Sequence, residues 1–332
     1  MSIQKKYVTC VGDVCVDLIV PYGEFKQYLR NMELMKDPDV QRPQVFRRLG
    51  GTSGNTILIA SALGAPVMIA SKVSAESHGN FILKELNKYQ VNTDYLRQEG
   101  PDGLCMVAIL DNDDREMMIW NDNNVPSFFF EEYSIDNEIA RKSSIIHFAG
   151  VMIREDAEQE REMIRFAKVA RETGCKCTLD LNLRIETWGF TPERRQIFDR
   201  MIAECNIVFG SGSDEFEPFT GIHEFGSSAI AFSKIYSDKT VIARDGANDV
   251  LIINNGEYTS IPTLPTNIVN KVGAGDAFDA GFLTAYAEDH SIEECVKYGI
   301  AVASYTIGSE NAHAVPSEAE LKRMIAAIGN KK

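Results

Sequence analysis

The part of the sequence best suited to chemistry is a run of small residues that precedes an aspartate. The stretch NKVGAGDAFDAGF, residues 270–282, places Gly273, Ala274 and Gly275 directly before Asp276. Apolar residues then recur at helical spacing, which predicts a helix with one buried face. Because the run carries almost no side chains, a phosphate group can approach the first backbone N–H groups and the positive end of the helix dipole. The stretch therefore predicts an anion hole.

Asp276 itself has two interpretations. A carboxylate repels phosphate, so a simple phosphate cradle has no need of it, whereas a base that takes a proton from an attacking hydroxyl belongs at this position. The alternative is a helix N-cap, which stabilises a helix by about 1 kcal/mol. The stretch alone leaves both interpretations open.

A second set of candidate residues lies near the N-terminus, in RRLGGTSGNTILIASALGAP. Gly50 and Gly51 are typical of a hinge or a tight turn. A helix is predicted from about Asn55 to Leu63, and Gly64 ends it. Asn55, in the first helical turn, is either a ligand contact or a cap.

Strand-like and helix-like runs alternate over most of the chain, which indicates an α/β fold with a largely parallel sheet. In one such unit the strand SSIIHFAG is followed by a helix over 156–173 and by the strand CKCTLDLN. That second strand ends at Asp180, and open parallel sheets bind ligands at the carboxyl ends of their strands. Further on, Thr191 and Pro192 predict a helix start, KTVIAR a strand, and Asn255-Gly256 the turn of a hairpin.

Two regions interrupt this alternation. The segment from about Leu18 to Leu49 has no clean period, and GLCMVAILDNDDREMMIW is typical of two antiparallel strands joined by a polar turn. Together they predict a small β-rich flap beside the main sheet.

Composition excludes several classes of function. The formal net charge is −14, spread along the chain without a basic stripe, which argues against nucleic acid and anionic membranes as partners. No apolar run is long enough to span a bilayer. The apolar N-terminal stretch is interrupted by Asp13 and Asp17 and is interpreted as a buried first strand that leads into a site, not as a signal peptide. Seven cysteines without zinc-finger spacing are interpreted as reduced core thiols, and a cytoplasmic protein is expected.

The two glycine-rich stretches together resemble the signatures of the ribokinase-like (PfkB) carbohydrate kinase family. NKVGAGDAFDAGF is similar to the C-terminal signature and GGTSGNTILIASALG to the N-terminal one, in the right order and far apart in the chain. KVSAESHGNFI and VNTDYL also lie in the expected order. The resemblance implies one ribokinase-like domain over residues 1–332, a three-layer α/β/α fold with a mostly parallel central sheet. It also implies a small β-rich lid formed by about 18–49 and 103–122.

The resemblance also implies roles for the candidate residues. Asp276 is the catalytic base, and Gly273, Ala274 and Gly275 form the anion hole. Asp17, five residues after Gly12, and Asn55 bind sugar hydroxyls. Gly50 and Gly51 are the hinge of a lid that closes over the sugar and excludes water.

Two further elements of the family match in part. The Asn-x-x-Glu element, near magnesium and the ATP phosphates, places its Glu at Glu215 as a ligand to a magnesium-bound water, but its Asn position holds Gly212. DLNLRIETW resembles a segment of fructokinases and 2-keto-3-deoxygluconate kinases. In that segment Arg184 is a candidate for substrate binding, where its charge offsets that of phosphate. The alternative for Arg184 is a structural salt bridge.

Two departures from the family pattern concern the nucleotide and cation sites. Asn270 and Lys271 stand where the family has Asp-Thr, which puts activation by a monovalent cation such as potassium in doubt. Lys271 either places its own charge near the phosphates or points into solvent. Arg244 and Asp245 replace the usual Thr-x-Gly pattern. Nucleotide binding is therefore expected to be atypical, with Arg244 as a candidate contact.

The resemblance thus predicts an ATP- and Mg²⁺-dependent carbohydrate kinase. Its expected substrate is a hexose such as fructose or a keto-deoxy sugar acid, and its possible partner is a second copy bound through the lid. The alternatives are a nucleoside kinase and a non-catalytic sugar-binding protein with the kinase fold.

Overall fold

The structure is a computed structural model that describes residues 6–33, 43–99, 104–109, 115–120, 133–153, 157–269 and 272–329. Asn270 and Lys271 lie outside these residues. So do residues 34–42, 103, 110–114 and 121–122 of the expected lid. Within the described residues, no helix is long and apolar enough to cross a membrane.

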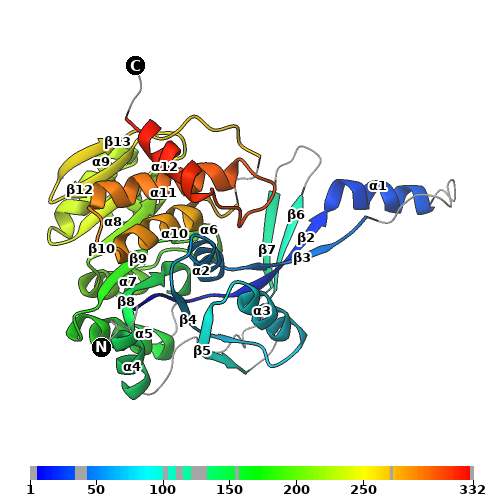
Figure 1. Ribbon diagram of the computed structural model, residues 1–332, viewed down its shortest axis with the longest axis horizontal. Coiled ribbons are helices and arrows are strands. Elements are labelled where there is room, and N and C mark those ends of the chain that lie inside the picture. The colour runs from blue at the N-terminus through cyan, green and yellow to red at the C-terminus, as the bar shows by residue number, and fades with distance from the viewer. Residues whose placement is uncertain are drawn as a thin grey trace.

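A nine-stranded sheet forms the centre of the molecule, with the strand order β13-β12-β11-β10-β9-β8-β1-β4-β5 (Figure 1). Neighbouring strands between β5 and β11 pair in parallel. The pairings of β11 with β12 and of β12 with β13 are antiparallel. The strands of this sheet are β1 (Tyr7–Val11), β4 (Val67–Val73), β5 (Asn92–Gln98), β8 (Ser143–Ala149), β9 (Lys176–Asp180), β10 (Ile207–Ser211), β11 (Thr240–Arg244), β12 (Val250–Asn254) and β13 (Glu257–Ile261).

Helices cover both faces of the sheet, each over its own apolar core, so the chain has a three-layer α/β/α architecture. One face carries α4 (Tyr133–Lys142), α5 (Ala157–Glu172), α7 (Pro192–Glu204), α8 (Gly212–Thr220) and α9 (Phe225–Ile235). The other carries α2 (Thr52–Ala62), α3 (Ser77–Lys88), α10 (Ala274–Ala287), α11 (Ile292–Ile307) and α12 (Glu318–Ala327). The short helices η1 (Gly150–Met152) and α6 (Ile185–Trp188) follow β8 and β9.

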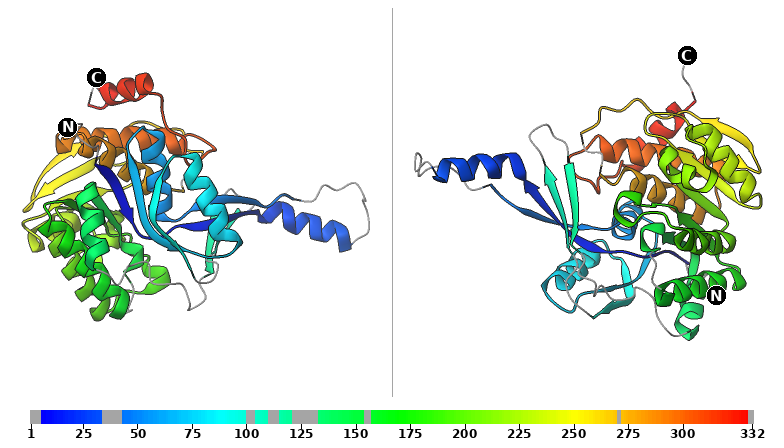
Figure 2. Two further views of the ribbon diagram at one scale, coloured as in Figure 1. Left: turned by 60° about the horizontal axis from the view of Figure 1, so that its bottom comes forward. Right: turned by 180° about the vertical axis from the view of Figure 1, so that it is seen from behind.

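A second sheet of four strands stands beside the main one, in the order β3-β2-β6-β7 (Figure 1). Its strands are β2 (Cys15–Pro21), β3 (Phe46–Gly50), β6 (Leu104–Ile109) and β7 (Arg115–Trp120). β6 and β7 are antiparallel, as the sequence predicted. The helix α1 (Tyr22–Glu33) follows β2 and projects away from the body (Figure 2).

The small β-rich flap predicted from the segments 18–49 and 103–120 is confirmed as the second sheet, although 18–49 also contains the twelve-residue helix α1. Two local predictions were wrong. One strand was expected at the N-terminus, but the structure has two, β1 in the main sheet and β2 in the second sheet. The chain changes from one sheet to the other at residues 12–14. The helix expected from Asn55 begins at Thr52, since Asp13 supplies the acceptor for its first amides.

Several local predictions are confirmed. β8, α5 and β9 form the predicted βαβ unit. The Thr191 hydroxyl accepts a hydrogen bond from the Arg194 N–H and caps α7, and Pro192 is the first helical residue. β12 and β13 form the predicted hairpin, in which Asn255 and Gly256 both have positive φ, at 49° and 84°.

Candidate active site

The predicted anion hole lies at the N-terminus of α10. Gly273 occupies the N-cap position with φ 79°, a left-handed conformation that favours glycine, and its carbonyl accepts the Ala277 N–H at 2.8 Å. The amides of the first helical turn have no partner within the helix and are available to an anion. Asp276 is not the N-cap, because the cap position is Gly273 and no side chain caps this helix.

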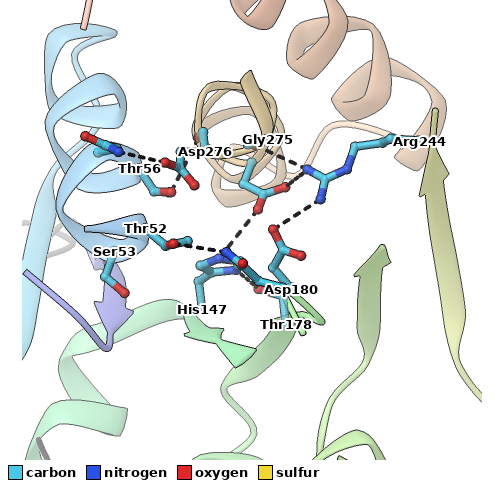
Figure 3. A network of polar contacts seen from close by, with 12 residues as sticks. Thr52, Ser53, Thr56, His147, Thr178, Asp180, Arg244, Gly275 and Asp276 are labelled. Atoms are coloured by element: carbon cyan, nitrogen blue, oxygen red, sulfur yellow. Dashed lines mark hydrogen bonds and ion pairs between the residues drawn. The ribbon is translucent and has the colours of Figure 1, made fainter. Parts of the chain in front are cut away.

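The Asp276 carboxylate instead faces α2 (Figure 3). Its Oδ2 accepts a hydrogen bond of 2.7 Å from Asn55 Nδ2, across 221 positions of sequence. The partly buried position of the carboxyl raises its pKa to about 7, and the charges of Asp13 and Asp180 act in the same direction. The Asn55 hydrogen bond and the charge of Arg184 lower the pKa and oppose this shift. A carboxyl with a pKa near neutrality is well matched to general-base work.

Asn55 is held at its other end by a residue from the far end of the chain. The Asn55 side-chain oxygen accepts a hydrogen bond of 2.9 Å from His313 Nε2, in the loop between α11 and α12. Both side chains are buried. Asp276, Asn55 and His313 therefore form a continuous chain of hydrogen bonds.

Asp13 lies in the turn where the chain passes from the main sheet to the second sheet. Its two carboxylate oxygens accept hydrogen bonds from the Thr52 N–H at 2.9 Å and from the Ser53 N–H at 3.3 Å, so Asp13 caps α2. Gly51, with φ 87°, lies so close that a Cβ there would be 2.7 Å from the Asp13 carbonyl oxygen. This contact explains why the second residue of the pair is glycine.

Asp17 lies on β2, opposite Arg48 on β3. It is 5% exposed, and burial raises the pKa of its carboxyl, against the lowering effect of the Arg48 charge. The ion pair between Arg48 Nη2 and Asp17 Oδ2 is 3.5 Å long. A Cβ on Gly50 would lie 2.1 Å from Asp17 Oδ1, so the first glycine of the pair leaves room for this carboxylate.

Beneath the anion hole lies a buried network centred on Arg244 (Figure 3). The guanidinium donates to Asp279 Oδ1 at 2.7 Å and to the Gly275 carbonyl oxygen at 3.2 Å through Nη1. Through Nη2 it donates to Asp180 Oδ2 at 3.1 Å. The rings of Phe209 and Phe278 lie 5.7 and 5.2 Å from the guanidinium carbon. Arg244 therefore joins the ends of β9 and β11 to the first turns of α10.

His147 extends this network from β8. Its Nδ1 is 2.9 Å from the Thr178 hydroxyl, and its Nε2 is 3.7 Å from Asp279 Oδ2. The ring is fully buried, and that burial lowers its pKa to about 4, so it is neutral at physiological pH.

Glu215 and Arg184 follow two neighbouring strands, Glu215 after β10 and Arg184 after β9. Glu215 lies in the first turn of α8, where its Oε2 accepts the Ser211 N–H at 2.6 Å. Burial, followed by the charge of Asp180, raises its pKa to about 8. Arg184 has φ 48° and is half-buried, and its charge lowers the pKa of both Asp13 and Asp276.

The structure thus gathers most of the predicted residues at one edge of the sheet. Different elements bring Asn55, Arg184, Glu215 and the α10 N-terminus there, whereas Asp17 lies on the second sheet and Lys271 lies outside the described residues. Arg244 makes its contacts with protein groups below the anion hole.

Sequence reasoning did not assign Asp13, His147, Asp279 or His313 to the site. Asp13 carried a usable signal, because it directly follows a buried strand and a glycine, Gly12. The other three have no local signal, since their partners lie 31 to 258 positions away in sequence.

Comparisons with known proteins agree with this architecture. The family described as pfkB family carbohydrate kinase matches residues 5–319. The chain is 24% identical over 333 residues to a 5-dehydro-2-deoxygluconokinase from Listeria monocytogenes, an alignment that covers 98% of this chain and 97% of that one.

Two solved structures share the fold. The 2-dehydro-3-deoxygluconokinase from Thermotoga maritima gives a TM-score of 0.79 at 18% identity and covers 97% of this chain and 98% of that one. The Arabidopsis thaliana ribokinase complexed with ribose and ATP gives a TM-score of 0.75 at 20% identity, with 96% and 98% covered.

Proposed function

The chain belongs to the pfkB family of carbohydrate kinases, and from that premise we propose that it transfers the γ-phosphoryl group of ATP to a hydroxyl of a keto-deoxy sugar acid. The observation that carries the proposal is the hydrogen bond from Asn55 to Asp276, beside the open N-terminus of α10. This hydrogen bond joins the two glycine-rich stretches into one proposed site. The carboxyl of Asp276, with a pKa of about 7, is suited to accept the proton of the sugar hydroxyl.

In the proposed reaction the sugar hydroxyl attacks the γ-phosphorus, the bond to the ADP oxygen breaks, and Asp276 takes the hydroxyl proton. The amides around Gly273, Ala274 and Gly275 hold the transferred phosphoryl group and stabilise its charge. Asp17 and Asn55 orient the sugar through its other hydroxyls. Because little covalent chemistry falls to the protein, orientation and charge stabilisation supply most of the rate enhancement.

Magnesium fits the residues present. Among the described residues, no group of three His, Cys, Asp or Glu side chains is arranged to hold a metal ion. Mg²⁺ in kinases is commonly held by substrate phosphates, waters and one or two carboxylates, so a full protein cage is not needed. Glu215 would hold it through a bound water, and a nearby cation would favour the ionised form of this carboxyl, whose pKa is about 8 without one. When bound with ATP, the ion supplies charge neutralisation on the phosphates.

An acidic substrate is supported by Arg48. Its Nε is buried and has no hydrogen-bond partner among the described residues, and its Nη2 forms an ion pair of 3.5 Å with the proposed sugar ligand Asp17. A guanidinium with unused donors beside the sugar site is suited to a substrate carboxylate. The relative from Listeria monocytogenes is likewise named for a sugar acid, 5-dehydro-2-deoxygluconate.

We further propose that the second sheet acts as a lid over the sugar and that residues 1–332 work as one kinase unit. Support comes from Asp17, which lies on the second sheet, and from Asn55 and Asp276, which lie on helices of the main body.

Large apolar side chains are exposed on α1 and at the start of β3: Tyr22, Leu29, Val45 and Phe46. They suit contact with a second copy of the chain, which light scattering would detect as a dimer.

A cytoplasmic setting is also proposed. It is supported by the need for ATP and by the cysteines of the described residues, which form no disulfide bonds.

The test is ATP consumption over a panel of hexoses, pentoses, keto-deoxy sugar acids and nucleosides. We expect the highest kcat/KM for a keto-deoxy sugar acid, and a lower value for fructose. In Arg48→Met, kcat/KM for the acid should fall about 10- to 100-fold, since hydrogen bonds to charged groups contribute about 1.5–3 kcal/mol, while the value for a neutral sugar should fall less, through the loss of the Arg48 ion pair with Asp17.

Other results would overturn the assignment. A preference for adenosine or inosine would make the protein a nucleoside kinase. Thermal stabilisation by a sugar without any sugar-dependent ATP consumption would make it a sugar-binding protein.

A further inference from the structure

We propose that His313 is a positioning residue for the phosphoryl transfer, which fixes the side-chain amide of Asn55 so that its NH₂ group, and not its oxygen, faces the catalytic carboxylate. The inference rests on the proposed role of Asp276 as the base. His313 lies 258 positions from Asn55 in sequence and does not contact the carboxylate itself.

The first step is the identity of the two ends of the amide. Asn55 Nδ2 lies 2.7 Å from Asp276 Oδ2, and Asn55 Oδ1 lies 2.9 Å from His313 Nε2. An ionised carboxylate only accepts hydrogen bonds, so the end that faces it must be the NH₂ group. The amide oxygen then faces His313, and the ring must donate through an N–H at Nε2.

The second step is the state of the ring. His313 is 7% exposed, and burial, with a smaller effect from the charge of Arg48, lowers its pKa to about 4. The ring is therefore neutral at physiological pH and carries a single proton, which the contact with Asn55 assigns to Nε2. Because this proton is present across the working pH range, the donor to Asn55 is constant.

The third step is the rigidity of the loop that carries the ring. The His313 N–H donates to Asn311 Oδ1 at 3.0 Å, and the Ala314 N–H donates to the Asn311 carbonyl at 3.0 Å. The Thr306 hydroxyl in α11 donates to the Ala314 carbonyl at 2.9 Å. These bonds hold His313 in place without any contribution from Asn55.

The consequence concerns the titration of Asp276. If His313 is lost, the Asn55 amide can rotate and place its oxygen against the carboxylate, which disfavours the ionised form. The carboxyl is sensitive to such a change because its surroundings are mostly acidic. The charged and titratable groups around it are Asp13 and Cys10 from the β1 region, Asp180 and Arg184 from the end of β9, and Asp279 from α10.

The test compares His313→Leu, which has no donor, with His313→Gln, whose amide N–H can replace Nε2. We expect the acidic limb of the pH profile of kcat/KM to move up by about one pH unit in His313→Leu, with kcat at pH 7 reduced about tenfold. His313→Gln should restore both to within about threefold of the wild type. His313→Met replaces the leucine variant if that one does not fold.

Thr306→Val is the control for a purely structural role, because it removes a hydrogen bond from the same loop without touching Asn55. It should lower the melting temperature and leave the pH profile in place. An unchanged acidic limb in His313→Leu, a glutamine variant no better than leucine, or an equal shift in Thr306→Val would each overturn the inference.

A readout without substrate separates this inference from the proposed function. The titration of Asp276, followed in the apoprotein by NMR of [¹³Cγ]aspartate and assigned with Asp276→Asn, should move upward in His313→Leu whatever the substrate is. If that shift occurs and no sugar acid is phosphorylated, the proposed function fails and the positioning contact stands. If sugar acids are phosphorylated and the titration does not move, only the inference fails.

Discussion

Asp276 combines two properties that a general base in a kinase needs. It lies in the first turn of α10 beside the proposed anion hole, and the pKa of its carboxyl is raised to about 7 by its partly buried position and by neighbouring acids. A base with this pKa can accept a proton at neutral pH and release it again. The same shift makes an ionised Asp276 unfavourable in the folded chain.

This cost predicts how Asp276→Asn changes stability with pH. The carboxyl of the unfolded chain ionises near its ordinary pKa of 3.8, whereas the folded chain retains the proton up to about pH 7. The folded state therefore binds more protons between these values, and the stability of the wild type falls as the pH rises through this window. We expect Asp276→Asn to be more stable than the wild type by about 1–3 kcal/mol at pH 8 and nearly equal to it at pH 4.

Urea denaturation of the apoproteins at the two pH values measures this difference. Equal stability of the two proteins at pH 8 would show that Asp276 carries no raised pKa.

Gly50 predicts a second effect at the residue scale. In Gly50→Ala the new Cβ would lie 2.1 Å from Asp17 Oδ1, so the carboxylate must move. We expect a loss of about 1–3 kcal/mol in stability and a higher KM for the sugar, with the KM for ATP little changed. Gly226→Ala in α9 is the matched control, because no atom lies closer than 3.4 Å to its Cβ. A normal sugar KM in Gly50→Ala would contradict the placement of Asp17.

The sequence identified those site residues that belong to a local pattern. The GAGD run, the glycine pair and Asn55 could be predicted because small residues beside a helix start have few uses. His313 and Asp279 could not, because their roles depend on contacts with Asn55 and Arg244 that only the folded chain creates. Asp276 was ambiguous until the structure placed Gly273 at the cap position.

At the scale of elements, α10 is fastened to the sheet by Arg244. The guanidinium bonds to the Gly275 carbonyl and to the buried carboxylates Asp180 and Asp279. Arg244 is the cation shared by these two buried acids, so its removal would leave both without this positive partner. Arg244 therefore links the proposed anion hole to the ends of β9 and β11, in addition to the apolar packing of α10 in the core.

Arg244→Met should destabilise the protein by about 3–5 kcal/mol, because it leaves two buried carboxylates without their cation. The double variant Arg244→Met/Asp279→Asn replaces one of those buried acids, whose pKa burial raises well above its ordinary value, and should be more stable than Arg244→Met alone, with a coupling of about 1–3 kcal/mol. Urea denaturation measures both values. Additive effects of the two substitutions would mean that Arg244 and Asp279 do not interact in solution.

Most elements of the main sheet could be predicted, since βαβ units repeat a strong alternation of strand and helix patterns. The break between β1 and β2 was missed because the run YVTCVGDVCVDLIV has similar apolar residues on both sides of Gly12 and Asp13, and this pattern does not show that the chain changes sheets there. The helix α1 was missed although Tyr22, Phe25 and Leu29 recur at helical spacing; it projects from the body and leaves Tyr22 and Leu29 exposed.

At the scale of the whole molecule, the proposed sugar site joins two sheets. Asp17 comes from the second sheet, and Asn55 and Asp276 come from helices on the main sheet. The chain carries a net charge of −14, so an anionic substrate needs local positive groups. Arg48, Arg184 and the N-terminus of α10 provide them at this junction.

A ligand that bridges the two sheets should restrict their relative motion. We expect a saturating sugar acid to slow backbone hydrogen exchange in β2 and β3 by about tenfold, with little change in the hairpin of β12 and β13, which is the internal control. ATP alone should have a smaller effect on β2 and β3. Unchanged exchange in these strands at saturating substrate would argue against a lid.

The most direct test of the account is the turnover of Asp276→Asn with the best sugar acid of the substrate panel. The substitution keeps the size of the side chain and removes the base. We predict that kcat falls on the order of a hundredfold or more, while the protein stays folded and binds ATP with an affinity within about threefold of the wild type. A kcat within twofold of the wild type would show that Asp276 is not the base and would contradict the proposed mechanism.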